Sequence, residues 1–424
     1  MVCFFDKKQI PLQHPDIILV YSDTSSQFMK KRFLLFALAL YLFSCNPVRK
    51  TLEGGSIKQT SFTEKIPFTF DSGLPIIKVE INGKHYNFLF DTGAPTVISP
   101  ELQQLLQLKP KAVGKTSDSQ GNTNQQAFVK IPLLKIGSLQ FENIGASVID
   151  MKKVFEFKCM DFDGIIGANQ MEKAIWQIDY RNLVITASNT ISNFDIPKQA
   201  EILNFIPKAG QMTPRVAVKI GNQIASTTFD TGAATDFSLP YQIYKSEVAS
   251  INGVEAIGSS SSGIFGASKN ATTTYKKVPS LAIGNIEIKN QIVAFNEGTT
   301  AIIGNSFLKN YRLVLSWKEN KIYLIKELEN QNEKLETYGI GLRYVNLKPT
   351  IVKIFKGTEA EKAGLLINDQ IIAVDDKSTS NLTQAEACNY TFNNILNGKE
   401  TRSITILRNG EKLVFNLKKT VLLN

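Results

Sequence analysis

The sequence contains little histidine and little cysteine. Among its 424 residues there are 2 histidines and 4 cysteines. A Ser-His-Asp or Cys-His catalytic arrangement would have to use His85, because the other histidine, His14, lies ahead of a predicted signal segment. A zinc site lacks both the ligand count and the ligand spacing. We therefore expect chemistry that uses neither histidine nor a bound metal or other cofactor.

Nucleic-acid recognition is another function that the sequence gives no reason to expect. The formal charge is +10, but the basic residues are scattered and no nucleic-acid motif accompanies them. We interpret this charge as a solvated lysine surface, with contact to an anionic membrane surface as the alternative. The composition, 43% hydrophobic and 20% charged, is that of a globular protein, and the length leaves room for two or three domains.

A short apolar segment near the N-terminus predicts export. The stretch "MKKRFLLFALALYLFSC" begins at Met29 with basic residues and continues as an apolar run. This pattern is typical of a secretory signal, and the run is too short to span a bilayer. Residues 42–45, Leu-Phe-Ser-Cys, resemble the lipobox of bacterial lipoproteins, which implies that Cys45 is lipidated and becomes the mature N-terminus. A buried N-terminal helix is the alternative.

This interpretation sets the expected N-terminal organisation. Residues 1–28 would be an upstream extension, residues 29–45 a lipoprotein signal peptide and residues 46–62 a linker. The mature protein would be lipid-anchored in the cell envelope, facing the periplasm or the cell surface. Cys159 and Cys388 lie in different segments, so we expect lone core thiols rather than a bridge.

An internal duplication is the strongest pattern in the sequence. The stretch "LPIIKVEINGKHYNFLFDTGAPTVIS" recurs as "TPRVAVKIGNQIASTTFDTGAATDFS", and the aligned aspartates are 139 residues apart. Each copy alternates apolar and polar residues over short runs that end at Asn-Gly, Gly-Asn or Ile-Gly turns, which predicts β-strands. We expect two β-rich lobes, residues 63–195 and 196–327, with a short helix near residues 170–176 in the first and near residues 306–310 in the second.

The duplicated motif resembles the active-site motif of a known family. Phe-Asp-Thr-Gly-Ala occurs at residues 90–94 and again at residues 229–233, and Ile-Ile-Gly follows each motif roughly 75 residues later. Two such motifs in one chain resemble the bilobal aspartic proteases, the group that holds pepsin and, as dimers of single lobes, the retroviral proteases. The resemblance covers residues 63–327 and implies a mainly β fold of two pepsin/retropepsin-like β-barrel lobes. Two ordinary turns that each begin with aspartate are the alternative.

Paired carboxyls can hydrolyse a peptide bond without a metal or a histidine. One carboxyl takes a proton from water while the other polarises the carbonyl, which requires a pair that shares one proton. The resemblance implies that Asp91 and Asp230 form this pair, and like charges held close together titrate at separated pKa values. The resemblance implies support of the active site by Thr92, Gly93, Ala94, Ile166 and Gly167 in the first copy and by Thr231, Gly232, Ala233, Ile303 and Gly304 in the second.

The expected supporting roles differ by residue type. The threonines would hydrogen-bond across the lobe interface, the glycines would let the backbone approach the carboxyls, and the Ile-Ile-Gly segments would form an apolar wall. Ala94 and Ala233 depart from pepsin, which carries a hydroxyl there that hydrogen-bonds the catalytic carboxyl. We therefore expect raised pKa values and a pH optimum nearer mildly acidic to neutral than strongly acidic.

Two further segments near the first motif need an interpretation. Residues 115–128, "KTSDSQGNTNQQAF", resemble a mobile flap over the active site but have no aromatic tip. Residues 71–73, Asp-Ser-Gly, also resemble an active-site triplet. They have no counterpart in the second copy, and we interpret them as a turn.

The chain changes character after the second copy. A charged stretch, residues 328–336, suits a linker. Residues 337–420, which include "AEKAGLLINDQII", resemble the PDZ domains of bacterial secreted proteases. The resemblance implies a PDZ-like domain in which a peptide C-terminus binds beside a strand that accepts it by strand addition. The residues implied for this carboxylate-binding loop are Gly339, Ile340, Gly341 and Leu342. A PDZ fold that serves only for packing is the alternative.

Together these patterns predict a lipid-anchored aspartic endopeptidase with PDZ-mediated recruitment or regulation of peptide or protein substrates. Because both halves of the site lie in one chain, we expect a monomer. The alternative is a peptide-binding lipoprotein that keeps the protease fold and has lost turnover. The intact motifs in both copies favour the enzyme.

Overall fold

The structure is a computed structural model that describes residues 46–268, 272–329 and 334–424. Strands make up 49% of it and helices 14%, which confirms the predicted mainly β fold. The expected upstream extension, the signal peptide and Cys45 lie outside the described residues. Within these ranges, no helix combines the length and apolar character needed to cross a bilayer.

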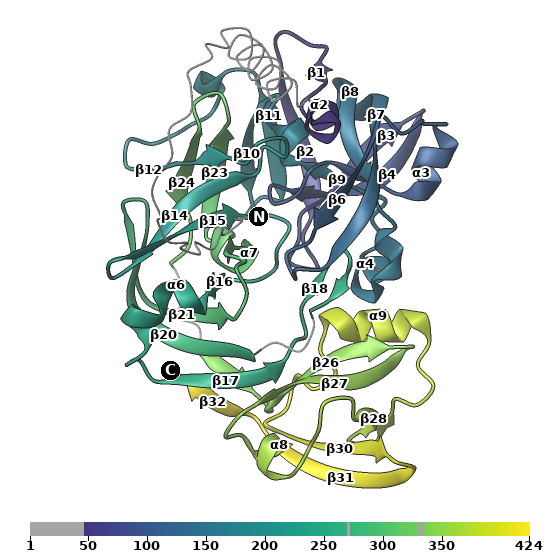
Figure 1. Cartoon of the computed structure of the whole chain (residues 1–424), viewed down its shortest axis with the longest axis vertical. Helices are drawn as coiled ribbons and strands as arrows, with labels where there is room; N and C mark the ends of the chain where they lie inside the picture. Colours follow the sequence, from purple (N-terminus) through teal and green to yellow (C-terminus); the bar gives the residue numbers. More distant parts are fainter. Residues whose placement is uncertain (1–45, 269–271, 330–333) are drawn as a thin grey trace, which may run out of the picture. The chain divides into compact units, whose positions relative to one another are not determined.

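The first lobe is built from short strands and a few helical turns (Figure 1). Its strands are β1 (Ser56–Ile57), β2 (Thr63–Thr69), β3 (Ile76–Ile81), β4 (Lys84–Asp91), β5 (Val97–Ile98), β6 (Ala112–Ser117), β7 (Thr123–Ile136), β8 (Leu139–Val148), β9 (Gly164–Gly167), β10 (Ile175–Asp179) and β11 (Val184–Ser188). Its helices are α2 (Pro47–Leu52), α3 (Pro100–Leu105), η1 (Met151–Lys153), α4 (Phe155–Met160), α5 (Ala168–Met171) and η2 (Ile191–Asn193).

The second lobe repeats the central hairpin of the first, its parallel support strand and the short helix that follows. Its strands are β12 (Glu201–Asn204), β13 (Ile206–Pro207), β14 (Pro214–Ile220), β15 (Gln223–Phe229), β16 (Phe237–Pro240), β17 (Gly253–Gly258), β18 (Ser262–Gly263), β19 (Gly266–Ala267), β20 (Thr272–Ile283), β21 (Ile286–Asn296), β22 (Ile302–Ile303), β23 (Tyr311–Ser316) and β24 (Lys321–Lys326). Its helices are α6 (Tyr241–Val248) and α7 (Asn305–Leu308). The helices after the two Ile-Ile-Gly segments are present, but α5 begins and ends earlier than the predicted residues 170–176.

The strand that leads to each motif follows directly from the sequence pattern. In β3, Ile77, Val79 and Ile81 are buried while the residues between them face outward, and β14 repeats this alternation. A tight turn at Asn82 and Gly83, both with positive φ, then returns the chain as β4, which ends at Asp91. The corresponding β14–β15 hairpin brings the chain to Asp230.

The two lobes share one sheet and one core. Strand β10 pairs antiparallel with β23, so the strand order β12-β24-β23-β10-β11-β2 takes three strands from each lobe. Trp176 of β10 is fully buried, and its ring lies edge-on to that of Phe90, with centroids 5.1 Å apart. One cluster of buried apolar side chains extends through both lobes. This shared core fixes the ends of β4 and β15 relative to each other.

The C-terminal module, residues 335–423, continues the sheet of the second lobe. Its strands are β25 (Leu335–Thr337), β26 (Ile340–Val345), β27 (Lys348–Phe355), β28 (Gln370–Val374), β29 (Lys377–Ser378), β30 (Thr401–Arg408), β31 (Glu411–Lys418) and β32 (Thr420–Leu423). Its helices are α8 (Glu359–Lys362) and α9 (Gln384–Phe392). Strand β27 pairs with β17 of the second lobe, so backbone hydrogen bonds join the module to that lobe (Figure 1).

Two expectations about the chain's organisation are wrong. Cys159 of α4 and Cys388 of α9 form a disulfide with Cα atoms 5.1 Å apart, instead of remaining lone thiols. The pairing escapes sequence reasoning because 229 residues separate the cysteines and only the fold brings them together. Residues 46–62, expected as a linker, contain α2 and β1, and Leu52 is only 4% exposed.

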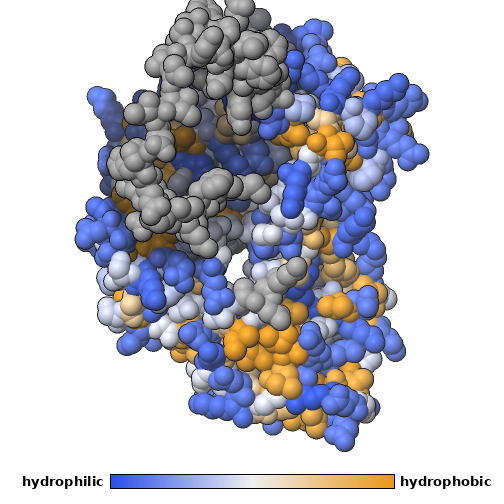
Figure 2. Space-filling view, in the orientation of Figure 1, coloured by the Kyte–Doolittle hydropathy of each residue, from blue (hydrophilic) through white to orange (hydrophobic). Residues whose placement is uncertain are grey.

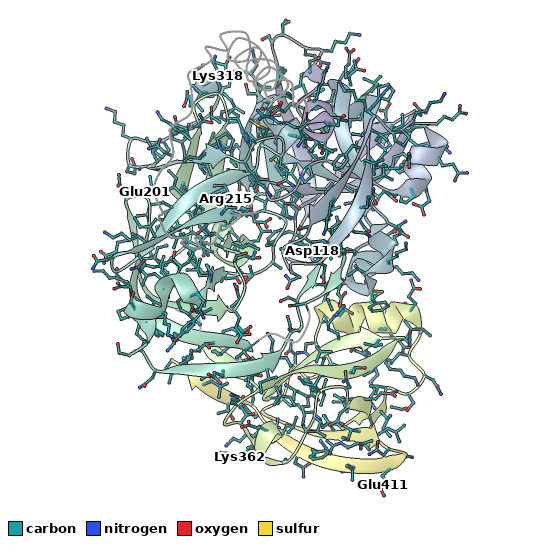
Figure 3. All side chains as sticks on the ribbon, viewed as in Figure 1. Asp118, Glu201, Arg215, Lys318, Lys362 and Glu411 are labelled. Atoms are coloured by element: carbon teal, nitrogen blue, oxygen red, sulfur yellow. A yellow bond between two sulfur atoms is a disulfide. The ribbon has the colours of Figure 1, made fainter. Side chains whose placement is uncertain are left out.

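Charged side chains are distributed over the surface rather than gathered on one face. Lys318, Glu201, Lys362 and Glu411 lie at the periphery, while Asp118 lies between the two lobes (Figure 3). The face drawn in Figure 2 is mostly hydrophilic, with apolar residues gathered over part of the C-terminal module.

Candidate active site

The two motif aspartates lie at equivalent strand ends. Asp91 is the last residue of β4, which pairs in parallel with β9 so that Asp91 lies opposite Gly167. Asp230 directly follows β15, and its backbone N–H donates to the carbonyl of Ile303 at 2.9 Å. The parallel strands carrying Ile166 and Ile303 therefore support the backbone just before each aspartate, with both isoleucines fully buried.

Thr92 and Thr231 join the two motifs through a reciprocal set of hydrogen bonds. The Thr92 hydroxyl donates to the carbonyl of Phe229 at 2.5 Å and accepts from the N–H of Thr231 at 3.0 Å. The Thr231 hydroxyl donates to the carbonyl of Phe90 at 2.8 Å and accepts from the N–H of Thr92 at 3.0 Å. Both threonines are fully buried, so these four bonds hold the two loops in one geometry.

Gly93 and Gly232 lie against the carboxyl group of the opposite lobe. A Cβ atom on Gly93 would overlap the Asp230 carboxyl, and a Cβ on Gly232 would overlap that of Asp91. The close approach of the carboxyls thus requires glycine at both positions. The N–H of each glycine donates to the aspartate two residues before it, at 2.6 Å for Asp91 and 2.8 Å for Asp230.

Burial raises the pKa of both carboxyls, and the neighbouring Asp91 charge raises that of Asp230 further. Desolvation raises the pKa of Asp91, but hydrogen bonds from the N–H groups of Gly93 and Ala94 counteract it. The pKa of Asp230 lies well above its usual value because of burial and because of the nearby Asp91 charge. The two carboxyls also hydrogen-bond each other. These directions favour Asp230 as the carboxyl that holds the shared proton.

The remaining predicted support residues lie around this pair. Ala94 and Ala233 line the cavity above the carboxyls. The carbonyl of Ala94 accepts from the N–H of Ala168, next to Gly167. In the second lobe the carbonyl of Ala233 accepts from the N–H of Asn305, next to Gly304. Each Ile-Ile-Gly segment thereby fastens the far end of its motif loop.

Two buried asparagines were missed by the sequence analysis. Asn169 accepts from the N–H of Thr96 at 2.7 Å and donates to the carbonyl of Leu52 at 3.0 Å. Asn305 donates to the carbonyl of Thr231 at 2.7 Å and accepts from the Tyr180 hydroxyl at 2.8 Å. An Asn within two residues after Ile-Ile-Gly in both copies was the available signal. These side chains satisfy buried backbone groups of the motif loops.

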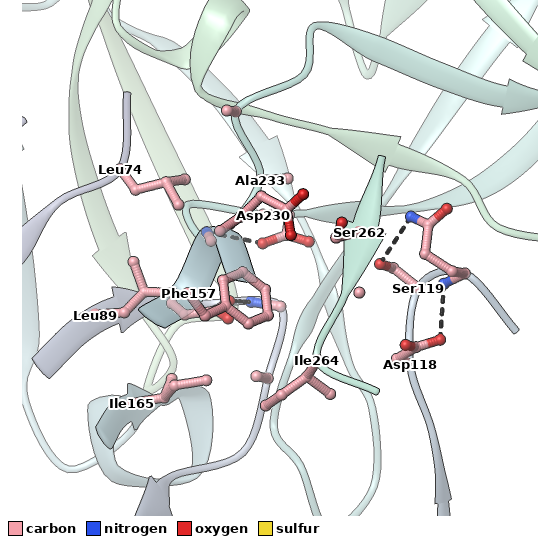
Figure 4. A pocket seen from close by; sticks show the side chains of 18 of the residues that line it. Leu74, Leu89, Asp118, Ser119, Phe157, Ile165, Asp230, Ala233, Ser262 and Ile264 are labelled. Atoms are coloured by element: carbon pink, nitrogen blue, oxygen red, sulfur yellow. Dashed lines mark hydrogen bonds between the residues drawn. The ribbon is translucent and has the colours of Figure 1, made fainter. Parts of the chain in front are cut away.

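A cavity of about 600 Å³ opens over the two aspartates. Apolar side chains line one part of it: Leu74, Leu89, Phe157, Ile165 and Ile264 gather beside Asp230 in Figure 4. Thr116, Ser147 and Ser262 also belong to the cavity lining, and their hydroxyls are buried without a hydrogen-bond partner among the described residues. The cavity thus offers an apolar surface for the side chains of a bound peptide.

Two loops, one from each lobe, meet over the cavity. The turn between β6 and β7 places the Asp118 carboxylate where it accepts from the N–H of Phe265 at 3.1 Å. The Asn122 side chain donates to the carbonyl of Ala267 at 3.2 Å, and the Thr300 hydroxyl donates to that of Ser119 at 3.0 Å. The predicted flap is therefore held against the β18–β19 hairpin of the second lobe.

The other sequence-predicted residues lie outside the carboxyl pair. Residues 71–73 form a turn, as predicted, closed by a hydrogen bond from Gly73 to Phe70, and Asp71 lines the cavity. The predicted carboxylate-binding loop, residues 339–342, lies at the start of β26. A Cβ on Gly341 would lie 3.5 Å from the hydroxyl oxygen of Ser260, which lines the same cavity.

Comparison with known protein families supports a peptidase. A family model described as an aspartyl protease matches residues 77–169, which extend from β3 through Asp91 to α5. The match supports a protease of the hydrolase class. No curated protein matches the chain. Within the described ranges, no group of three or more His, Cys, Asp or Glu side chains is placed to hold a metal ion.

Proposed function

We propose that the chain is an aspartic endopeptidase in which Asp91 and Asp230 activate one water molecule. The observation that carries this proposal is the contact between two buried carboxyls that come from equivalent loops of two lobes and open into one cavity. The backbone N–H donors at Asp91 and the raised pKa of Asp230 give the two groups different roles.

The proposed reaction needs only these two side chains and water. The Asp91 carboxylate takes a proton from water as the water oxygen bonds to the peptide carbonyl carbon, and Asp230 gives its proton to the carbonyl oxygen. The resulting diol collapses when Asp91 delivers its proton to the amide nitrogen and the C–N bond breaks. Asp230 recovers a proton from one diol hydroxyl, so the pair returns to its starting state.

The proposed location is the cell envelope, with Cys45 as the site of a lipid anchor. The Cys159–Cys388 disulfide supports an oxidising compartment, because disulfides persist outside the cytoplasm. The predicted signal segment supports the same compartment. Peptides or proteins of that compartment are the proposed substrates.

A peptide C-terminus that binds at Gly339, Ile340, Gly341 and Leu342 is a further proposed partner. Deleting the C-terminal module would be a poor test of this role. The deletion would expose the edge of β17 and leave Cys159 and Glu156 without their partners. A point variant such as Gly341→Val in the intact chain, assayed against proteins with free and amidated C-termini, tests the role directly.

The dyad is tested by comparing three matched Asp→Asn variants on a peptide mixture. Asp91→Asn and Asp230→Asn should each lower kcat/KM by at least about 10³-fold, because each removes one half of the proton-transfer pair. Asp71→Asn is the control, since Asp71 lines the same cavity but lies in a separate turn. The Asp71→Asn variant should cleave the peptides at the same bonds as the wild type.

The outcomes separate the enzyme from a peptide-binding protein. Cleavage that persists in Asp91→Asn or Asp230→Asn contradicts the assignment of the dyad. A wild-type chain that binds peptides at the cavity without cleaving any of them would show the non-catalytic alternative to be correct. Cleaved products identified by mass spectrometry and peptide binding measured by fluorescence anisotropy distinguish these cases.

A further inference from the structure

The C-terminal module contributes to the wall of the active-site cavity. Thr391 and Phe392, at the end of α9, line the same cavity as Asp91 and Asp230. Phe392 is 38% exposed, which is high for a large aromatic side chain. The Thr391 hydroxyl donates to the carbonyl of Ala387 in its own helix, so the residue is fixed in position.

Helix α9 is fastened to the first lobe through α4. The Cys159–Cys388 disulfide joins the two helices covalently. Arg343 of the module and Glu156 of α4 form a two-point ion pair, at 2.8 Å and 3.1 Å, with side chains only 15% and 16% exposed. Helix α4 also supplies Phe157 and Met160 to the apolar part of the cavity. The position of the module and the shape of the cavity are therefore coupled.

The module is fastened to the second lobe as well. Strand β27 pairs with β17 over three residue pairs, beginning with Phe355 opposite Ala256. The Lys353 ammonium group donates to the Tyr275 hydroxyl at 3.0 Å, and the rings of Phe355 and Tyr275 lie 5.6 Å apart. A backbone ladder on one side and a disulfide on the other make the module a fixed bridge between the lobes beside the cavity.

We propose that Phe392 and Thr391 form a substrate subsite, in which the C-terminal module selects an apolar side chain of the bound polypeptide. This inference rests on the proposed peptidase function and deepens it. Glu156 is neutralised by Arg343, so this wall carries no free carboxylate from α4 and favours an apolar group over a charged one. Cys159 and Cys388 are positioning residues that hold α9 against α4.

The test is a positional scan with the full-length chain. A peptide that the wild type cleaves is resynthesised with Leu or Asp at each of four positions on either side of the cut bond. At one position the wild type should cleave the Leu peptide with a higher kcat/KM than the Asp peptide. The Phe392→Ala variant should reduce this preference about 3- to 10-fold. The expected reduction is modest because Phe392 is partly exposed. Phe392→Leu should keep most of the preference.

Two further variants complete the design. Leu366→Ala, at a 53% exposed apolar residue of the same module that does not line the cavity, is the matched control and should leave all preferences unchanged. The double variant Cys159→Ser/Cys388→Ser should weaken the preference at the same position that Phe392→Ala affects. A merely structural role for the disulfide would instead lower cleavage of all peptides equally.

A binding experiment keeps the inference independent of turnover. The same peptides are titrated into Asp230→Asn, with and without Phe392→Ala, and affinity is measured by fluorescence anisotropy. Loss of the Leu preference in the double variant supports the subsite even without cleavage. Positional preferences that Phe392→Ala leaves unchanged in both assays overturn it. Cleavage that survives Asp91→Asn overturns the proposed peptidase mechanism instead.

Discussion

The first and second lobes have equivalent core strands but differ in the elements that surround the aspartates. Both carry the same hairpin, parallel support strand and buried asparagine beside the motif. In the first lobe, α4 lies ahead of the Ile-Ile-Gly segment. In the second lobe, residues 297–301 connect β21 to β22 without a helix, and the structure describes this connection throughout. The second lobe alone carries the β18–β19 hairpin and extends its sheet into the C-terminal module.

The equivalent elements and the differing elements of the two lobes have separate effects on the site. The symmetric elements bring the carboxyls together, because a repeated sequence repeats the same loop on both sides of the interface. The asymmetric elements line the cavity with different residues on its different sides. Asp91 has two backbone donors from its own loop, while Asp230 faces the Asp91 charge, so equivalent residues have unequal pKa values.

The largest expected effect is on the symmetric threonine pair. Thr92→Val and Thr231→Val should each lower the free energy of unfolding by about 2–4 kcal/mol, because each leaves a buried N–H and a buried carbonyl unpaired. Chemical denaturation of the full chain measures this. Thr92→Ser and Thr231→Ser keep the hydroxyl and should lose much less. If only one Val variant were destabilised, the two lobes would not be equivalent here.

The next expected effect is a pH dependence of stability from the dyad. The folded state raises both carboxyl pKa values, so the dyad's contribution to stability is greatest below the unfolded pKa of about 4 and is lost as the pH rises through the folded pKa. Asp230→Asn removes the more strongly shifted group. The unfolding free energy of Asp230→Asn, relative to that of the wild type, should therefore increase as the pH rises. A difference between the two proteins that does not change with pH would contradict the raised pKa of Asp230.

The pH dependence of cleavage should also reflect the raised pKa values of the two carboxyls. Raised pKa values and the alanines at positions 94 and 233 predict a pH optimum that is mildly acidic to neutral. Ala94→Ser or Ala233→Ser would add a donor to the ionised form and move the acidic limb of the kcat/KM profile to lower pH. A wild-type profile that peaks below about pH 3 would be inconsistent with this account.

A smaller effect is expected where the two loops meet over the cavity. Asp118→Asn should raise KM about 3- to 10-fold, because the carboxylate accepts from N–H groups of its own turn and from Phe265 of the other lobe. Ser119→Ala in the same turn is the control, since the contact from Thr300 is to the backbone carbonyl of Ser119. Steady-state kinetics that show equal KM values for both variants would exclude this role for Asp118.

The smallest effect is expected in the first lobe's N-terminal helix. Arg49 and Glu53 form an ion pair at 2.7 Å with side chains 58% and 37% exposed. Glu53→Gln should change the free energy of unfolding by less than about 0.5 kcal/mol, because water screens such pairs. A thermal denaturation scan measures it, and a loss above about 1 kcal/mol would show that α2 depends on the pair.

The sequence predicted the parts of the site that local, repeated patterns encode. The duplicated alternation predicted both lobes, and the repeated Asp-Thr-Gly predicted the pair of Asp91 and Asp230. It did not predict the disulfide or the contact of Phe392 with the cavity, because both depend on how the C-terminal module packs. The burial of Leu52 was missed for the same reason.

By itself, the sequence determined the strands, the turns between them and the two equivalent loops that carry the aspartates. Backbone preferences and alternating burial act over a few residues, so they can be recognised without the fold. Only the tertiary structure decided that the two carboxyls are buried beside each other and which segments enclose the cavity. Desolvation and charge depend on neighbours that the chain brings together from distant positions, and no local pattern specifies those neighbours.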